Sequence, residues 1–167
     1  MVHGCVVKGD GNMTVMLIGN SYAEKISQGI VKIMDGKFKT IHLVYKPYCS
    51  VFPGLSGDGK GGCDIFENLT VQSVKLVQPD ILFISSNYRF HIFPAIQEPI
   101  TNDTANFDNA TILIQSALDI YSNFTDHIII IEPQAVFNHP IAYHLAKSLA
   151  GYEDIHQLDY SIGVCLN

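Results

Sequence analysis

The chain has few charged residues, a deficit of basic ones and no long hydrophobic run, and each of these absences excludes a class of protein. Only 16% of its 167 residues are charged, whereas 47% are hydrophobic. This composition excludes a disordered segment, which would lack the apolar residues needed to bury a core. The length suits one compact domain, so we expect residues 1–167 to form a single domain.

The shortage of basic residues argues against nucleic acid as a partner. The chain has 10 Lys and Arg against 16 Asp and Glu, and the formal net charge of -6 opposes capture of a phosphate backbone. The apolar run at His127–Ile131 is far shorter than the roughly 20 residues of a membrane-spanning helix. We therefore expect no nucleic-acid partner and no membrane span in this segment.

The N-terminal residues show no secretory signal, which taken alone indicates a cytosolic protein, but glycosylation sequons indicate the opposite. Five of the ten Asn residues begin an Asn-x-Thr tripeptide, whereas chance placement of these common turn residues would give roughly one. The five are Asn12, Asn68, Asn102, Asn109 and Asn123. They predict an extracellular or secretory-lumen glycoprotein in which all five side chains are exposed.

The four cysteines also favour an oxidising compartment. Cys49 and Cys63 stand at the two ends of one Gly-rich loop, where a disulfide would hold the loop closed, and we expect that bridge. The pairing of Cys5 and Cys165 stays open. Glycosylation without a signal peptide predicts a piece of a longer protein whose targeting element lies upstream.

Apolar runs alternate regularly with segments of helical period, which gives four βα units. The expected strands are Thr14–Gly19, Phe38–Tyr45, Asp80–Ser85 and His127–Glu132. Strands that are apolar on nearly every residue and separated by helices predict a doubly wound α/β domain with a parallel sheet. The loops that follow the strands should share one rim, because ligands of such sheets bind at the carboxyl ends. These loops are Gly19–Tyr22, Lys46–Cys63, Ser85–Phe107 and Pro133–Pro140.

The segment Gly19–Ala23 stands where the first of these strands turns into its helix. Gly19 permits a tight turn, and Ser21 would then present its hydroxyl at a helix N-terminus, where free N–H groups favour an oxyanion. An ordinary N-cap serine would explain Ser21 equally well.

Here the sequence resembles the SGNH hydrolase superfamily, whose first block is Gly-Asp/Asn-Ser at the end of the first strand. More narrowly, it is similar to the extracytoplasmic SGNH domain of acyltransferase-3-type membrane O-acyltransferases, where LIGNSYA and a Cys-containing loop recur in this order. The resemblance covers about Cys5 to Tyr160. It implies a three-layer flavodoxin-like fold with a mainly parallel sheet, and a membrane acyltransferase domain in the parent chain.

The resemblance also implies roles for individual residues. Ser21 would be the nucleophile, and its backbone N–H one donor to the oxyanion. The resemblance also assigns Gly54 and the side-chain amide of Asn87 to the oxyanion. Gly54, with Gly57 as its rival, matches the Gly of the second block. Asn87 matches the Asn of the third block, Gly-x-Asn-Asp, although Ser85 and Tyr88 replace the flanking Gly and Asp. A polar turn residue at a strand end is the other reading of Asn87.

The last family block, Asp-x-x-His, is not recognisable in this chain. Glu153–His156 has a carboxylate three residues before a His, but it follows the fourth helix too early for a fifth strand. We therefore expect the chain to be truncated before its last strand and helix, and the fragment to be inactive for want of a base. Neither the remaining histidines nor any other residues show ligand spacing, so we expect no metal and no cofactor.

Two functions from different classes remain. The first is O-acyl transfer or ester hydrolysis through Ser21, acting on an acyl ester or a hydroxyl-bearing substrate such as a glycan. The second is a non-catalytic secreted glycoprotein domain that binds a ligand on the retained scaffold. Nucleotide hydrolysis is disfavoured, because Gly54–Lys60 fits a phosphate-binding loop only without its Ser/Thr and lies inside the Cys49–Cys63 loop. An FMN site would need a Ser/Thr-rich first turn, which Gly19–Ala23 is not.

Overall fold

The computed structural model describes residues 1–56, 61–87, 108–131 and 150. All but the last of these belong to one compact unit that runs from Met1 to Pro133. The strands are β1 (His3–Lys8), β2 (Met13–Gly19), β3 (Phe38–Tyr45), β4 (Ile81–Ser85) and β5 (His127–Ile131). The helices are α1 (Ser21–Ile33), α2 (Cys63–Val77) and α3 (Asn109–Ser122).

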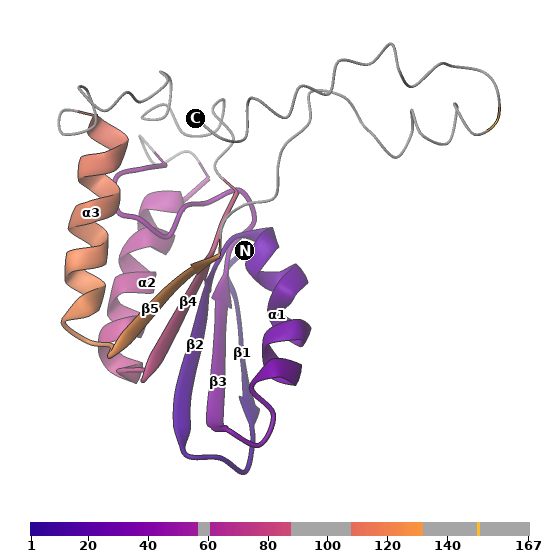
Figure 1. Ribbon diagram of the computed structural model, residues 1–167. Helices are drawn as coiled ribbons and strands as arrows, with labels where there is room; N and C mark the ends of the chain where they lie inside the picture. The colour runs from indigo at the N-terminus through magenta and orange to yellow at the C-terminus, as the bar shows by residue number, and fades with distance from the viewer. Residues whose placement is uncertain (57–60, 88–107, 132–149, 151–167) are drawn as a thin grey trace. The chain divides into compact units, whose positions relative to one another are not determined.

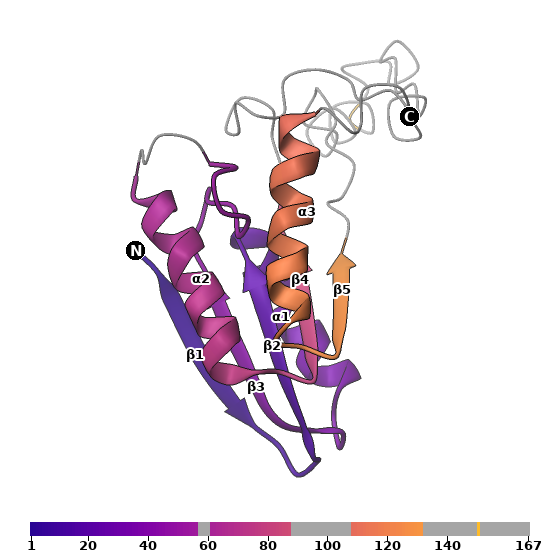
Figure 2. The ribbon, with the colours of Figure 1, turned by 90° about the vertical axis from the view of Figure 1, so that its left-hand side faces the viewer.

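The five strands form one sheet in the order β1-β3-β2-β4-β5. The strands β3, β2, β4 and β5 run parallel to one another, and β1 pairs antiparallel with β3. The helix α1 covers one face of the sheet, and α2 with α3 covers the other, as Figures 1 and 2 show. The predicted three-layer α/β fold with a mainly parallel sheet is thereby confirmed.

The central strand β2 explains why both faces are covered. Its alternate residues point to opposite sides. Val15 and Leu17 belong to the apolar cluster under α1, whereas Met16 and Ile18 belong to the cluster under α2 and α3. None of these four side chains is exposed. A strand that is apolar on every residue is therefore stable only between two layers of helices.

The edge strand β1 is not predicted by the sequence pattern. This strand pairs with β3 from His3 opposite Tyr45 to Lys8 opposite Thr40 and forms one edge of the sheet. Five of its six residues are exposed, so it lacks the buried apolar run by which the other strands were recognised. The fourth helix expected after Pro140 lies outside the described residues.

The sequons lie on the surface wherever the structure describes them. Four of the five Asn side chains are exposed, which confirms that part of the prediction. The four are Asn12, Asn68, Asn109 and Asn123. Asn102 lies outside the described residues. In the described part of the chain, no helix is long and apolar enough to cross a bilayer.

Exposure of these four Asn predicts that they accept glycans. Secretion of the chain from a eukaryotic cell should give a product heavier than 18.5 kDa that N-glycosidase reduces in steps. Replacing each exposed sequon Asn by Gln should remove one step from the gel ladder. A secreted product whose mass does not respond to the glycosidase would contradict the glycoprotein assignment.

Candidate functional site

The turn from β2 into α1 lies tightly against β4. Gly19 pairs with Ser85 in the parallel ladder, and a Cβ at Gly19 would come within 1.8 Å of the Ser85 carbonyl oxygen. No side chain fits into that space. The next residue, Asn20, donates its backbone N–H to the same carbonyl at 3.3 Å. Only glycine therefore lets the two strands approach closely enough to set the position of the turn.

The helix cap is Asn20 and not Ser21. The Asn20 side-chain oxygen accepts the backbone N–H of Tyr22 at 3.1 Å, which is the usual capping bond at a helix N-terminus. Ser21 is the first residue of α1 and is partly exposed. The reading of Ser21 as an ordinary N-cap is therefore wrong, and its hydroxyl makes no hydrogen bond to any residue that the structure describes.

The first turn of α1 leaves one backbone donor without a partner inside the helix. The N–H of Tyr22 is taken by the Asn20 side chain, and the N–H of Ala23 by the Asn20 carbonyl at 3.0 Å. The N–H of Ser21, as the first residue of a helix, has no intrahelical acceptor. Because the helix dipole is positive at this end, that N–H favours an anionic oxygen next to the Ser21 hydroxyl.

Asn87 lies against the same turn. The Asn20 side-chain nitrogen donates to the Asn87 carbonyl at 3.1 Å, and the Asn20 side-chain oxygen accepts the Asn87 backbone N–H at 3.4 Å. The Asn87 side-chain nitrogen donates to the Tyr22 hydroxyl at 2.7 Å. Asn20 and Asn87 are 4% and 7% exposed, so the two bonds between them are shielded from water, whereas the bond to Tyr22 is partly buried. The end of β4 and the start of α1 are thus joined by one polar network.

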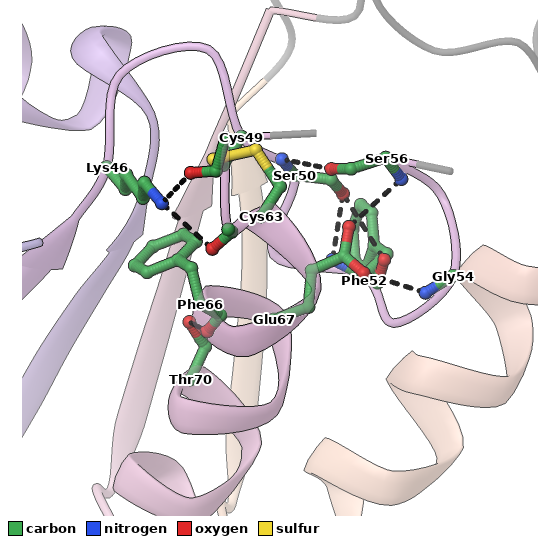
Figure 3. Close-up of a disulfide and its surroundings, with 12 residues drawn as sticks. Lys46, Cys49, Ser50, Phe52, Gly54, Ser56, Cys63, Phe66, Glu67 and Thr70 are labelled. Carbon is green, nitrogen blue, oxygen red and sulfur yellow. Dashed lines mark hydrogen bonds between the residues drawn. A yellow bond between two sulfur atoms is a disulfide. The ribbon is translucent and has the colours of Figure 1, made fainter. Parts of the chain in front are cut away.

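The loop after β3 begins on the same rim. Lys46 donates its backbone N–H to the Gly19 carbonyl at 3.2 Å. Together with the bonds between Asn20 and Asn87, this contact shows that the described starts of the first three predicted loops lie on one rim. The fourth predicted rim loop, Pro133–Pro140, lies outside the described residues. The loop is closed by the expected disulfide between Cys49 and Cys63, whose Cα atoms are 5.2 Å apart (Figure 3).

Glu67, on α2, holds the middle of this loop in place. Its two carboxyl oxygens accept the backbone N–H of Gly54 at 2.8 Å and of Ser56 at 3.0 Å, as Figure 3 shows. The side chain is 2% exposed. The N–H of Gly54, which the family resemblance assigns to the oxyanion, is therefore directed at Glu67 in this structure. The oxyanion role of Gly54 stays a prediction. Its rival Gly57 lies outside the described residues.

Sequence reasoning missed Glu67, although the pattern of α2 contained a signal. The buried residues of this helix are Cys63, Phe66, Glu67, Thr70 and Val74. These positions follow the i, i+3, i+4, i+7 spacing of one helical face, so a carboxylate occurs in the middle of an apolar stripe. A buried carboxylate requires hydrogen-bond donors, and the neighbouring Gly-rich loop supplies them.

None of the described histidines makes a hydrogen bond to Ser21. His3 stacks on Tyr45 with ring centroids 4.8 Å apart, and His127 starts β5 at the far end of the sheet. His42 lies within β3, where burial lowers the pKa of its imidazole. His156 and the rest of Glu153–His156 lie outside the described residues. Among the described side chains, no group of three or more His, Cys, Asp or Glu could hold a metal ion.

Comparison with known proteins bears on the family and the fold of the chain. A family model described as "SGNH domain (fused to AT3 domains)" matches residues 2–162. Among solved structures, the chain is similar to the periplasmic domain of a lipopolysaccharide acetyltransferase from Salmonella ser. Paratyphi A, with a TM-score of 0.62 and 17% identity. The alignment covers 85% of this chain and 52% of the other, so this chain spans about half of that structure. No curated protein matches the chain. At this identity the structural likeness shows the fold.

The close approach at Gly19 predicts a large effect of one methyl group. Gly19→Ala should destabilise the domain by about 3 kcal/mol or more, because its Cβ would meet backbone that cannot rotate away. Gly29→Ala is the matched control: Gly29 is exposed on α1, and an added Cβ meets nothing within 4 Å. That control should stabilise the helix by up to about 1 kcal/mol. Urea unfolding measures both, and equal effects of the two substitutions would contradict the packing described.

Glu67→Gln should loosen the loop after β3. The amide keeps one acceptor oxygen but sets an NH2 group against a backbone N–H, so a buried donor loses its partner at a cost of about 1–3 kcal/mol. Glu24→Gln is the control, since Glu24 only accepts the exposed Tyr45 hydroxyl and Gln still can. It should change the free energy of unfolding by less than about 0.5 kcal/mol. The Glu67 prediction is wrong if the two variants unfold at the same urea concentration.

Proposed function

The chain belongs to the family of SGNH domains fused to AT3 domains, and we propose that it supplies Ser21 as the nucleophile for O-acyl transfer or ester hydrolysis by the AT3-fused protein. The observation that carries the proposal is that Asn20, and not Ser21, caps α1. Asn20 caps the helix, so that neither the hydroxyl nor the N–H of Ser21 is taken up by the described residues, and we assign both to a substrate. A serine that merely capped the helix would have no such freedom.

The chemistry follows from the donors around Ser21. Its hydroxyl oxygen attacks the carbonyl carbon of an acyl ester while a base accepts the hydroxyl proton, and the carbonyl oxygen becomes an oxyanion. The Ser21 N–H and the second N–H of the Asn87 side chain are the donors that we assign to this oxyanion. Collapse of the intermediate releases the alcohol and leaves an acyl-serine. Water or a second hydroxyl then takes the acyl group.

We assign the base to the Asp-x-x-His block of the family and place it outside the described residues. Without a group that accepts its proton, a serine hydroxyl is a weak nucleophile. The hydroxyl of Ser21 makes no hydrogen bond to the described histidines, so none of these serves as the base in the proposal.

The proposed acceptor is a hydroxyl-bearing molecule such as a glycan, outside the cytoplasm. The similar Salmonella structure is a periplasmic domain of a lipopolysaccharide acetyltransferase, which supports a small acyl group and a sugar hydroxyl as the substrate class. The family description supports an AT3 domain as the partner. The exposed sequons and the Cys49–Cys63 disulfide support an oxidising, glycosylating compartment.

A non-catalytic binding domain on the same scaffold is the second candidate, and one observation favours it. The Gly54 N–H, which would complete a three-donor oxyanion site, is held by Glu67. A binding domain would not need that donor. The two candidates differ in what Ser21 does.

Esterase activity on p-nitrophenyl acetate separates them. Residues 1–167 alone should barely exceed background, and the AT3-fused protein should turn the ester over. In that protein Ser21→Ala should lower the rate by about 10²-fold or more, because members of a triad act as a unit. Ser27→Ala is the matched control, since this exposed α1 hydroxyl only donates to the Glu24 carbonyl.

Two results would change this assignment. Ser21-dependent turnover by residues 1–167 alone would mean that the base lies within them, and His156 and His139 should then be replaced first. An AT3-fused protein that is silent, or one that Ser21→Ala leaves unchanged, would make the binding domain the better reading.

A further inference from the structure

We infer that Asn20 and Tyr22 are positioning residues that together fix Asn87 as a donor toward the carbonyl oxygen of the substrate. The inference rests on the proposed role of Ser21. Its basis is a closed ring of hydrogen bonds that joins Asn20, Tyr22 and Asn87 through their side chains and backbone groups. Two of its members flank Ser21 in the sequence, and the third lies 67 residues beyond Asn20.

Asn20 fixes the backbone of Asn87. Its carboxamide donates to the Asn87 carbonyl at 3.1 Å and accepts the Asn87 N–H at 3.4 Å, which is the pattern one strand residue offers another. The residue after β4 is thereby held as if the sheet continued. Since the same oxygen of Asn20 accepts the Tyr22 N–H at 3.1 Å, one carboxamide sets both the start of α1 and the path of the chain at Asn87.

Tyr22 fixes the side chain of Asn87. The terminal torsion of an asparagine is soft, so a carboxamide without a partner can turn its oxygen or its nitrogen toward a given point. The Tyr22 hydroxyl accepts one of the two N–H bonds of the Asn87 amide at 2.7 Å. That contact selects the orientation with the nitrogen toward α1, and the planar amide then fixes the direction of its second N–H.

Tyr22 is itself restrained. Its N–H is bound by Asn20, and the Lys25 side-chain nitrogen lies over its ring at 5.2 Å from the centroid. Its side chain is half-buried, so the hydroxyl meets the buried Asn87 amide at a fixed place. An oxyanion donor that is already aligned before the substrate arrives avoids reorganisation during the reaction. Tyr22 therefore acts on the reaction through Asn87 without touching the reacting atoms.

Tyr22→Phe tests this inference, because it keeps the ring and removes only the acceptor. In the AT3-fused protein, kcat for p-nitrophenyl acetate should fall about 10-fold with KM little changed, the effect of one misdirected hydrogen bond in the transition state. In an Asn87→Ala background the same substitution should lower kcat less than about 2-fold. Equal losses in both backgrounds would mean that Tyr22 does not act through Asn87, and would overturn the inference.

Tyr45→Phe is the matched control. It removes another tyrosine hydroxyl with a 2.7 Å hydrogen bond to an α1 residue, Glu24, and touches neither Asn20 nor Asn87 in the described structure. Its kcat should stay within about 2-fold of the parent value. A loss as large as that of Tyr22→Phe would show that any tyrosine hydroxyl near α1 has this effect, and the inference would fail.

A second readout does not depend on activity. In a nitrogen-15 NMR spectrum of residues 1–167, the side-chain NH2 pair of Asn87 is identified by its loss in Asn87→Ala. Tyr22→Phe should shift this pair and speed its exchange with water, whereas Tyr45→Phe should leave it in place. An unmoved pair contradicts the inference even if kcat falls. If Ser21 proves not to be catalytic, this spectrum still decides whether Tyr22 holds Asn87.

Asn20→Asp answers the same question if Tyr22→Phe fails to fold. An aspartate keeps the helix cap, because its oxygen can accept the Tyr22 N–H, but it has no N–H for the Asn87 carbonyl. The Asn87 NH2 pair should therefore move in a protein whose α1 remains helical. A spectrum in which the pair keeps its position would show that Asn20 does not set Asn87.

Discussion

The contact between Gly19 and the Ser85 carbonyl is the constraint on which the rest of the site depends. It sets how closely the ends of β2 and β4 approach, because a side chain at Gly19 would occupy the same space as that oxygen. The fixed register of Gly19 with Ser85 then places Asn20, the residue after Gly19, beside Asn87, which lies two residues after Ser85. Without this approach the carboxamide of Asn20 could not reach both backbone groups of Asn87. The absence of a side chain at Gly19 thus allows the N-terminus of α1 to align with the end of β4.

The loop after β3 shows another way of fixing a rim segment. It has no regular secondary structure between β3 and α2 in the described residues, and links of different kinds hold it. The disulfide closes it, Glu67 binds two of its N–H groups, and the buried Tyr121 hydroxyl donates to the Val51 carbonyl. The covalent link restricts the unfolded chain, whereas the hydrogen bonds select one folded path. The direction of the Gly54 N–H is a consequence of that path.

The parts that the sequence predicts well are those that local patterns determine. The four apolar strands were recognised because burial on both faces leaves them no polar positions. The edge strand β1 escaped because it is exposed and carries no such run. At the site, the motif located Ser21 but did not tell whether Ser21 or Asn20 capped the helix, since both residue types favour that position. The contacts of Tyr22 and Glu67 depend on residues brought close only by folding, which no spacing rule expresses.

The kind of donor at the site also bears on the reaction. Phosphoryl transfer spreads charge over several oxygens and calls for cations, whereas acyl transfer develops one charge on one oxygen. Around Ser21 the described donors are a backbone N–H and a carboxamide, both neutral. Among the described residues, Lys46 donates to the carbonyls of Gly61 and Gly62, and Lys25 lies over the Tyr22 ring. The neutral donors described next to the Ser21 hydroxyl therefore fit the proposed acyl chemistry.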